Sequence, residues 1–222
     1  MIDVWDSQRL AHPWFARVDD LVARLADHRD WPTVAALNQL FSAELGRAGV
    51  MLVESTKPKR TRSKRPVDPE SLYEVRIANH GEIPTRPRNA HDLLNTIVWA
   101  AFPLSKLALS RRLAEIQRTR LAGRDRLPPS RSSEHDRLAL VDEGGLLRVA
   151  GTTWIFGHAI YEHAYAGNPA VRGTPVDLHL AHGAALPLST ARAAIDRAFA
   201  GADVAQLVRS GPGVPVEFGA TT

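Results

Sequence analysis

The chain has 222 residues, 44% of them hydrophobic and 23% charged, which are ordinary proportions for a soluble globular protein. It contains no cysteine, and this excludes disulfides, thiolate nucleophiles and cysteine-ligated metal centres. The formal net charge of +4 becomes −2 when the six basic residues at positions 57–65 are set aside, so most of the chain is not basic. We expect one domain over residues 1–222. A cytoplasmic location is also expected, because no apolar segment has the length of a signal-peptide core or a membrane span.

Apolar residues in the first fifty positions recur every three or four residues. They predict one helix over residues 14–28 and a second that begins at Pro32 and ends before Gly49. Residues 50–55 form a short apolar run that is typical of a strand. Residues 56–70 combine like charges with prolines, and we expect an exposed, mobile basic loop there.

The middle of the chain contains its most apolar helix. Residues 72–86 predict a short element followed by a turn at His80 and Gly81. An apolar helix is expected over residues 91–101. It should break at Phe102 and Pro103, and a longer helix should follow to about Leu121.

The last third of the sequence is less regular. Residues 135–151 are compatible with a hairpin that turns at the sequence DEGG, or with a short helix that ends at Gly144. Residues 152–167 predict another helix, and residues 179–222 a C-terminal helical extension with a tail that is either loop or an added edge strand. The fold class is therefore α+β and mainly helical, in a single compact domain with a few short strands.

Polar side chains stand at the start of the apolar helix 91–101. Asn89 is a good N-cap and Asp92 is favoured by the positive end of the helix dipole, so helix chemistry alone explains both. His91 and Asn95 lie four residues apart on a face that continues into the core, where each costs about 1–3 kcal/mol if it is buried without a partner. We therefore take His91, Asp92 and Asn95 as candidate catalytic residues.

Two basic residues flank this helix start. The guanidinium of Arg86 can clamp a carboxylate or phosphate, or it can pair with Asp92 or Glu82. Lys106 follows the helix break at Pro103. We take Arg86 and Lys106 as candidate anion-binding groups.

A later helix carries a second polar set. His158 and Glu162 are four residues apart, a spacing that allows them to chelate one divalent metal or to act as an acid–base pair; the alternative is a surface pair worth a few tenths of a kcal/mol. Tyr161 flanks the same face and is a further catalytic candidate. Asp142 and Glu143 precede two glycines, and we interpret them as turn acids.

The basic segment contains no aromatic residue, so base stacking is not indicated. A solvated loop is the favoured interpretation, and nucleic-acid binding is the alternative. The residues concerned are Lys57, Lys59, Arg60, Arg62, Lys64 and Arg65.

Three stretches together resemble the bacterial family catalogued as domain of unknown function 3025. They are YEVRIANHGEIPTRPRNAHDLLNTIVWAAFPLSKLAL, DRLALVDEGG and FGHAIYEHAY. The resemblance extends from about His12 to Leu178, and Ala90 and Leu94 depart from it where the family has Trp and Phe. It implies no reaction, cofactor or substrate. The matching polar residues are Tyr73, Glu74, Thr85, Arg86, Asn89, His91, Asp92, Asn95, Lys106, Asp142, Glu143, His158 and Glu162.

Three functions follow as hypotheses. The first is a small hydrolase, metal-assisted or acid–base, with a polar site where the faces carrying 91/95 and 158/162 meet. The second is a non-catalytic binding module whose polar residues form a buried structural network. The third is a nucleic-acid-associated protein that uses the basic segment. A divalent metal is the candidate cofactor and a small molecule the candidate ligand. No membrane association is expected, and the sequence leaves the oligomeric state open.

Overall fold

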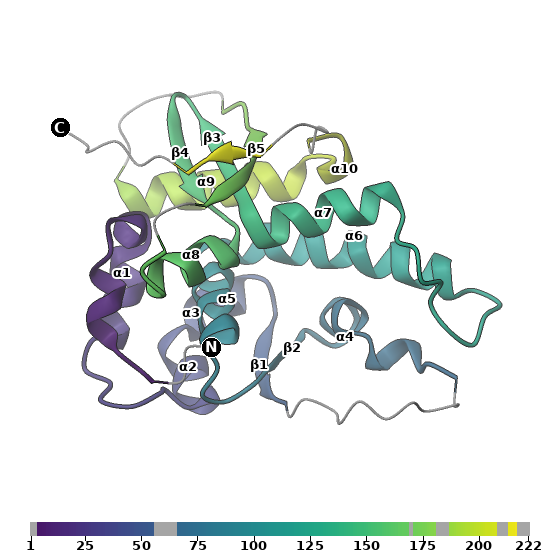
Figure 1. The fold of residues 1–222 in the computed structure, drawn as a ribbon, viewed down its shortest axis with the longest axis horizontal. Coiled ribbons are helices and arrows are strands. Elements are labelled where there is room, and N and C mark those ends of the chain that lie inside the picture. The colour runs from purple at the N-terminus through teal and green to yellow at the C-terminus, as the bar shows by residue number, and fades with distance from the viewer. Residues whose placement is uncertain (1–3, 56–65, 169–170, 181–186, 208–212, 217–222) are drawn as a thin grey trace.

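The computed structural model of the chain describes residues 4–55, 66–168, 171–180, 187–207 and 213–216. The basic segment at 57–65, and with it most of the predicted basic loop, lies outside these residues. The fold is mainly helical with a few short strands, as the sequence predicts (Figure 1). No single helix in the described ranges is long and apolar enough to cross a membrane; α5 and α6 reach that length and composition only as a pair bent by 113°.

The helices and strands alternate irregularly along the chain. The α-helices are α1 Asp19–Val22, α2 Val34–Leu40, α3 Ser42–Arg47, α4 Tyr73–His80, α5 Ala90–Ala101, α6 Pro103–Leu121, α7 Ser133–Gly144, α8 His158–Tyr165, α9 Leu188–Gly201 and α10 Val204–Leu207. The 3-10 helices are η1 Ser7–Ala11, η2 Pro13–Val18, η3 Ala23–Leu25 and η4 Pro69–Ser71. The strands are β1 Met51–Glu54, β2 Glu82–Thr85, β3 Gly145–Val149, β4 Thr152–Ile155, β5 Arg172–Asp177 and β6 Val214–Pro215.

The first two predicted helices are broken in the structure. The region 14–28 divides into η2, α1 and η3, and the backbone of Val18 leaves the helical region at the junction of η2 and α1, with φ −131°. This break lets Phe15, Val18 and Leu21 all bury their side chains. The second helix divides into α2 and α3 at Phe41, whose side chain is fully buried. Core packing thus overrides the continuous helical pattern in both places.

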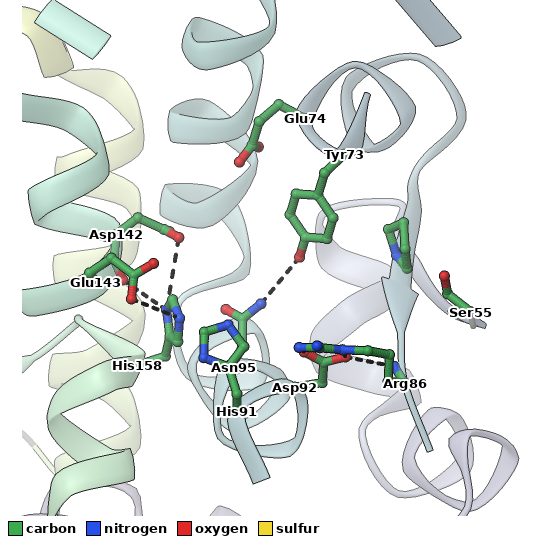
Figure 2. Close-up of a pocket in the computed structure, with 11 residues that line it drawn as sticks. Ser55, Tyr73, Glu74, Arg86, His91, Asp92, Asn95, Asp142, Glu143 and His158 are labelled. Atoms are coloured by element: carbon green, nitrogen blue, oxygen red, sulfur yellow. Dashed lines mark hydrogen bonds and ion pairs between the residues drawn. The ribbon is translucent and has the colours of Figure 1, made fainter. Parts of the chain in front are cut away.

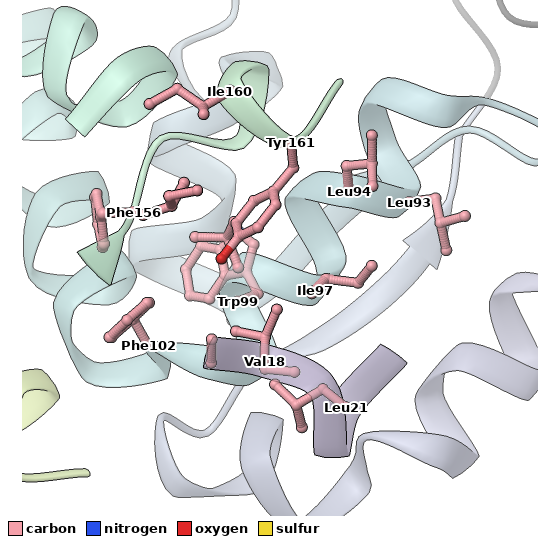
Figure 3. Packing of buried hydrophobic residues seen from close by; sticks show 14 of the residues in the cluster. Val18, Leu21, Leu93, Leu94, Ile97, Trp99, Phe102, Phe156, Ile160 and Tyr161 are labelled. Atoms are coloured by element: carbon pink, nitrogen blue, oxygen red, sulfur yellow. The ribbon is translucent and has the colours of Figure 1, made fainter. Parts of the chain in front are cut away.

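Helices α5 and α6 form the centre of the molecule, and their predicted boundary is correct. The side chain of Asn89 caps α5 by accepting a hydrogen bond from the backbone N–H of Asp92 at 3.0 Å. Phe102 leaves the helical conformation, and Pro103 starts α6, where its missing N–H is not needed. The apolar side chains of α5 lie in the core, where its residue Trp99 is fully buried with Phe102 and Phe156 nearby (Figure 3).

The region from α7 to α8 decides between the hairpin and the helix that were open for residues 135–151, and it corrects the helix predicted over residues 152–167. Residues 133–144 are a helix, so Asp142 and Glu143 lie in its last turn and not in a hairpin turn. The helix predicted over 152–167 is wrong at its start. Residues Thr152–Ile155 form β4, because their β-branched and aromatic side chains pair antiparallel with β3, and α8 begins only at His158.

Two small sheets flank the helices. Strands β1 and β2 pair in parallel, and the larger sheet has the order β4-β3-β5-β6. In this sheet β5 runs parallel to β3 but antiparallel to β6. Strand β5 is not predicted from the sequence, whereas β6 is an edge strand, one of the two alternatives predicted for the tail. Figure 1 shows the two sheets on opposite sides of α5.

Candidate functional site

A cavity of about 350 Å³ lies where α4, β2, α5, α7 and α8 converge (Figure 2). Its polar residues come from the ends of β1 and β2, the start of α4, the first turns of α5, the last turn of α7 and the first residue of α8. Most of the candidates chosen from the sequence therefore meet at one place. The residues that line the cavity are Ser55, Tyr73, Glu74, Pro84, Arg86, His91, Asp92, Asn95, Asp142, Glu143 and His158.

The faces of α5 and α8 meet, as the sequence predicts. The Nδ1 atom of His91 lies 3.2 Å from Oε2 of Glu162. The rings of His91 and His158 pack edge to face, with centroids 4.5 Å apart. The two helices thus bring two imidazoles together at the edge of the cavity.

Gly157 allows α8 to begin so close to the end of α7. A Cβ atom at this position would lie 2.3 Å from the Cα of Gly144 and 2.4 Å from the carbonyl oxygen of Glu143. Both are backbone atoms and cannot move aside easily. The glycine before His158 therefore fixes the imidazole against the last turn of α7.

Arg86 is bound by a carboxylate of the protein itself. Its Nε donates to Oδ2 of Asp92 at 2.8 Å and its Nη2 donates to Oδ1 at 2.6 Å. The backbone N–H of Arg86 also donates to Oδ2, at 2.6 Å. Hydrogen bonding to Asp92 raises the pKa of the guanidinium. The pairing that the sequence offered as the alternative to anion binding is the one observed.

Lys106 is buried and does not line the cavity. Its ammonium donates a hydrogen bond to Oδ1 of Asp142 and lies 5.6 Å from the ring centre of Trp99. Burial raises the pKa of Asp142, but the charge of Lys106 and its hydrogen bond, together with the interactions of His158 and His91, outweigh it, and the pKa is lowered. The second candidate for anion binding is therefore also neutralised by a carboxylate within the protein.

His158 presents a lone pair to the cavity. Its Nδ1 lies 2.9 Å from the carbonyl oxygen of Asp142, which can only accept a hydrogen bond, so Nδ1 carries the proton. The Nε2 atom is buried without a hydrogen-bond partner, 3.4 Å from Oε2 of Glu143. Burial lowers the pKa of His158 to about 4, so the imidazole is neutral near pH 7.

Glu74 lines the cavity and has a strongly raised pKa. Burial is the main cause, and the charge of Asp142 adds to it; together they raise the pKa of Glu74 to about 7, although Ser110 and Lys106 oppose the shift. Its Oε2 atom is buried and has no hydrogen-bond partner. This carboxyl group can therefore gain and lose a proton near pH 7.

Sequence reasoning did not choose Glu74 as a site residue. Its position beside Tyr73 in the motif shared with the resembled family was the one available signal. Its neighbours Ser110 and Asp142 lie on α6 and α7, so no local spacing could have revealed the site. Tyr73 itself accepts a hydrogen bond from Nδ2 of Asn95 at 3.2 Å, which leaves Oδ1 of Asn95 buried without a partner.

Tyr161 and Glu162, like Lys106, are not among the residues that line the cavity. Tyr161 does not line the cavity: it is fully buried in the core, where its ring stacks on Phe15 at 4.8 Å. Burial raises the pKa of its hydroxyl group. Glu162 contacts His91, whereas His158 faces Asp142 and Glu143, so the two residues predicted to chelate a metal have different partners. Within the described ranges no group of three or more His, Asp or Glu side chains is arranged to hold a metal ion.

Comparison with known proteins identifies one similarity. No curated protein and no solved structure matches the chain. A family described as protein of unknown function (DUF3025) matches residues 61–153. This segment contains α4, α5 and α7, and with them every residue that lines the cavity except Ser55 and His158. The similarity to the DUF3025 family thus covers residues 61–153, and this is the family that the motifs of the chain resemble.

Proposed function

We propose that the cavity is the active site of a small hydrolase that works by acid–base chemistry on a small molecule. The observation that carries this proposal is Glu74, a carboxyl group in the cavity whose pKa is raised to about 7. A general acid–base group works best when its pKa lies near the working pH, and such groups contribute about 10²–10⁴-fold to rate. Strongly perturbed acids in a cavity are typical of functional sites.

The proposed reaction uses both protonation states of Glu74. As a carboxylate it takes a proton from the attacking water, and as a carboxylic acid it returns that proton to the leaving group. The proton of His158 is on Nδ1, where it is donated to the carbonyl oxygen of Asp142. The Nε2 atom is therefore free to accept a hydrogen bond from the substrate or from the attacking water. The Arg86–Asp92 pair forms the opposite wall.

The geometry favours this acid–base form over the metal-assisted form. The Nε2 atom of His158 lies 3.4 Å from Oε2 of Glu143, but the described residues contain no group of three or more His, Asp or Glu side chains that could hold a metal ion. Catalytic metal sites use three protein ligands in most zinc enzymes. We therefore assign the proton transfer to Glu74 and derive no step through a metal.

A structural network is the second candidate function. It is supported by the pairs that surround the cavity, such as Lys106 with Asp142 and His91 with Glu162. A network that fixes helix packing needs its members to be satisfied. The unpartnered atoms of Glu74 and His158 are better explained by a ligand site. Nucleic-acid binding through residues 57–65 stays a prediction from the sequence.

Turnover measurements test the proposal. Wild-type protein, the Glu74→Gln variant and the Glu115→Gln variant are each incubated with a panel of small esters, amides and amidines, and the products are measured by mass spectrometry. Glu115 is an exposed acid on α6 outside the cavity and serves as the matched control. We expect at least one compound to be hydrolysed by wild type and control and about 100-fold more slowly by Glu74→Gln. Equal rates in all three proteins, or no hydrolysis by wild type, would contradict the proposal and favour the network.

A further inference from the structure

Three unpartnered hydrogen-bonding atoms line the same cavity. They are Oε2 of Glu74, Oδ1 of Asn95 and Nε2 of His158, and each is buried without a partner. Figure 2 shows the three side chains, which come from α4, α5 and α8, around the same space. A buried polar atom without a partner costs about 1–3 kcal/mol. Three such atoms at one place indicate that a ligand supplies the missing bonds.

All three atoms are acceptors. The amide Nδ2 of Asn95 donates a hydrogen bond to the hydroxyl group of Tyr73, so the atom of Asn95 without a partner is its oxygen, which can only accept. His158 carries its proton on Nδ1, and therefore Nε2 offers only a lone pair. Glu74 accepts through both oxygens when it is ionised. The ligand must consequently bring hydrogen-bond donors.

The charge of the cavity limits the ligand further. Among the described lining residues, Arg86 is the one that is always cationic, and Asp92 holds it in two hydrogen bonds. The adjacent Lys106 is bound by Asp142. The carboxyl groups of Glu74 and Glu143 have no cationic partner of this kind and line the cavity. An anionic ligand would be repelled there, whereas a cation would be attracted.

A polyatomic cation fits better than a metal ion. A metal needs several ligands converging at about 2 Å, and the described residues contain no set of three. An ammonium group offers three N–H donors and a guanidinium five, which can reach acceptors spread over a wider space. The volume of about 350 Å³ is in the range of small-molecule sites.

We propose that the site binds a small molecule through an N–H-rich cationic group, an ammonium or guanidinium, which donates to Glu74, Asn95 and His158. This inference rests on the proposed function and names the class of its substrate. One consequence is specific. A cation beside Glu74 favours the ionised carboxyl group, so binding should convert Glu74 to the form that accepts a proton, and affinity should rise with pH through about 7.

The other charged groups around Glu74 set the background of this pH dependence. Asp142 on α7 raises the pKa of Glu74, and Lys106 on α6 lowers it. His158 on α8 is neutral near pH 7, since its pKa is lowered to about 4 by burial. His91 on α5 and Glu143 on α7 also line the cavity, so the part of the pH response that is lost in Glu74→Gln is the part assigned to Glu74.

Binding of simple probes tests the inference. Methylguanidinium and ethylammonium are titrated into full-length protein, with N-methylurea as the neutral counterpart and acetate as the anion, and the histidine ring signals are followed by NMR. We expect the cations to bind at least tenfold more tightly than N-methylurea, acetate not to bind, and the cations to bind at least threefold more tightly at pH 8 than at pH 6. Glu143→Gln, a change at an exposed side chain, should weaken cation binding severalfold, and Glu115→Gln should leave it unchanged.

The possible outcomes separate this inference from the proposed function. Equal binding of methylguanidinium and N-methylurea, preference for acetate, no binding of any probe, or binding of Mg²⁺ or Zn²⁺ in place of the cations would each overturn the cation inference. Turnover that Glu74→Gln removes would still support the acid–base proposal in those cases. Conversely, tight cation binding together with unchanged turnover in Glu74→Gln would retain the cation site and overturn the acid–base function.

Discussion

Helix α6 contacts two buried carboxyl groups, Asp196 and Glu74, which differ in how many hydrogen bonds they accept. Asp196 of α9 is completely buried at the start of α6, where it accepts hydrogen bonds from the backbone N–H of Ser105 at 2.8 Å and from the Ser105 hydroxyl group at 2.8 Å. The backbone N–H of Leu104 adds a third bond at 3.3 Å. Glu74 of α4 faces the middle of α6 and keeps one oxygen without a partner.

The difference separates a carboxyl group that supports the fold from one that is open to a ligand. Asp196 satisfies the free N–H groups at a helix start, which stabilises the bend between α5 and α6. Burial raises the pKa of both groups, but Glu74 gains no comparable set of bonds and its pKa reaches about 7. Groups that lower the stability of the fold and make no compensating contact within it are expected at functional sites.

The largest expected effect is on turnover. Glu74→Gln keeps the size of the side chain and removes its ability to transfer a proton, so kcat should fall about 100-fold or more on any substrate that wild type hydrolyses. Asp196→Asn, measured in the same assay under conditions where it is folded, should change kcat less than threefold. A larger loss in Asp196→Asn than in Glu74→Gln would reverse the roles assigned to the two groups.

The next effect is on stability. Asp196→Ala strands the backbone N–H groups of Leu104 and Ser105 and should lower the free energy of unfolding by about 3 kcal/mol. Urea denaturation measures this loss. Glu115→Ala, at an exposed position of the same helix, should change stability by less than about 0.5 kcal/mol. A loss below about 1 kcal/mol in Asp196→Ala would show that the cap is not structural.

A glycine substitution tests how closely α7 and α8 approach. Gly157→Ala would place a Cβ atom 2.3 Å from the backbone of Gly144, and the shift that follows should cost about 2 kcal/mol and displace His158. Gly46→Ala in α3 is the control, because its Cβ would meet nothing within 4 Å and alanine favours a helix. Thermal melting of both variants suffices. Equal melting temperatures would mean that the close approach is not needed.

The smallest effect is a pH dependence of stability. The pKa of Glu74 is raised from 4.5 to about 7, so the folded protein binds more protons than the unfolded chain between these values, and stability should fall as the pH rises through them. The fall, on the order of 1–2 kcal/mol after allowance for solvent screening, should be absent in Glu74→Gln.

His158 should contribute a dependence of the opposite sign. Burial lowers its pKa from 6.5 to about 4, so the unfolded chain binds the extra proton and stability should rise as the pH rises through this window. The difference between wild type and His158→Gln in denaturation free energy isolates this part. Parallel pH profiles for wild type and both variants would count against the two shifted pKa values.

The sequence predicted those parts of the fold that depend on local signals. Asn89 as a cap and Phe102–Pro103 as a break follow from side-chain chemistry at single positions, and both are found. The breaks at Val18 and Phe41 were not predicted, since they follow from which side chains reach the core. Strand β4 was taken for helix because its pairing with β3 is a tertiary interaction.

The candidate site divides in the same way. His91 and His158 could be chosen because each is a polar residue on an otherwise apolar face, and the structure brings their rings together. Whether Arg86 and Lys106 can bind an anion depends on their ion-pair partners within the protein. The partner of Lys106 is Asp142, which lies far from it in the sequence, so this pair could not be predicted. The raised pKa of Glu74 depends on burial among α6 and α7, which periodicity cannot convey.

The most direct test of the account is the pKa of Glu74 in the folded protein. Protein labelled with ¹³C at the side-chain carboxyl group of glutamate is titrated by NMR, and the Glu74→Gln variant assigns the signal. We expect a midpoint near 7, in keeping with a proton-transferring group that is open to the cavity. A midpoint near the ordinary value of about 4.3 would contradict it, because the carboxyl group would then be ionised and unable to donate a proton near pH 7.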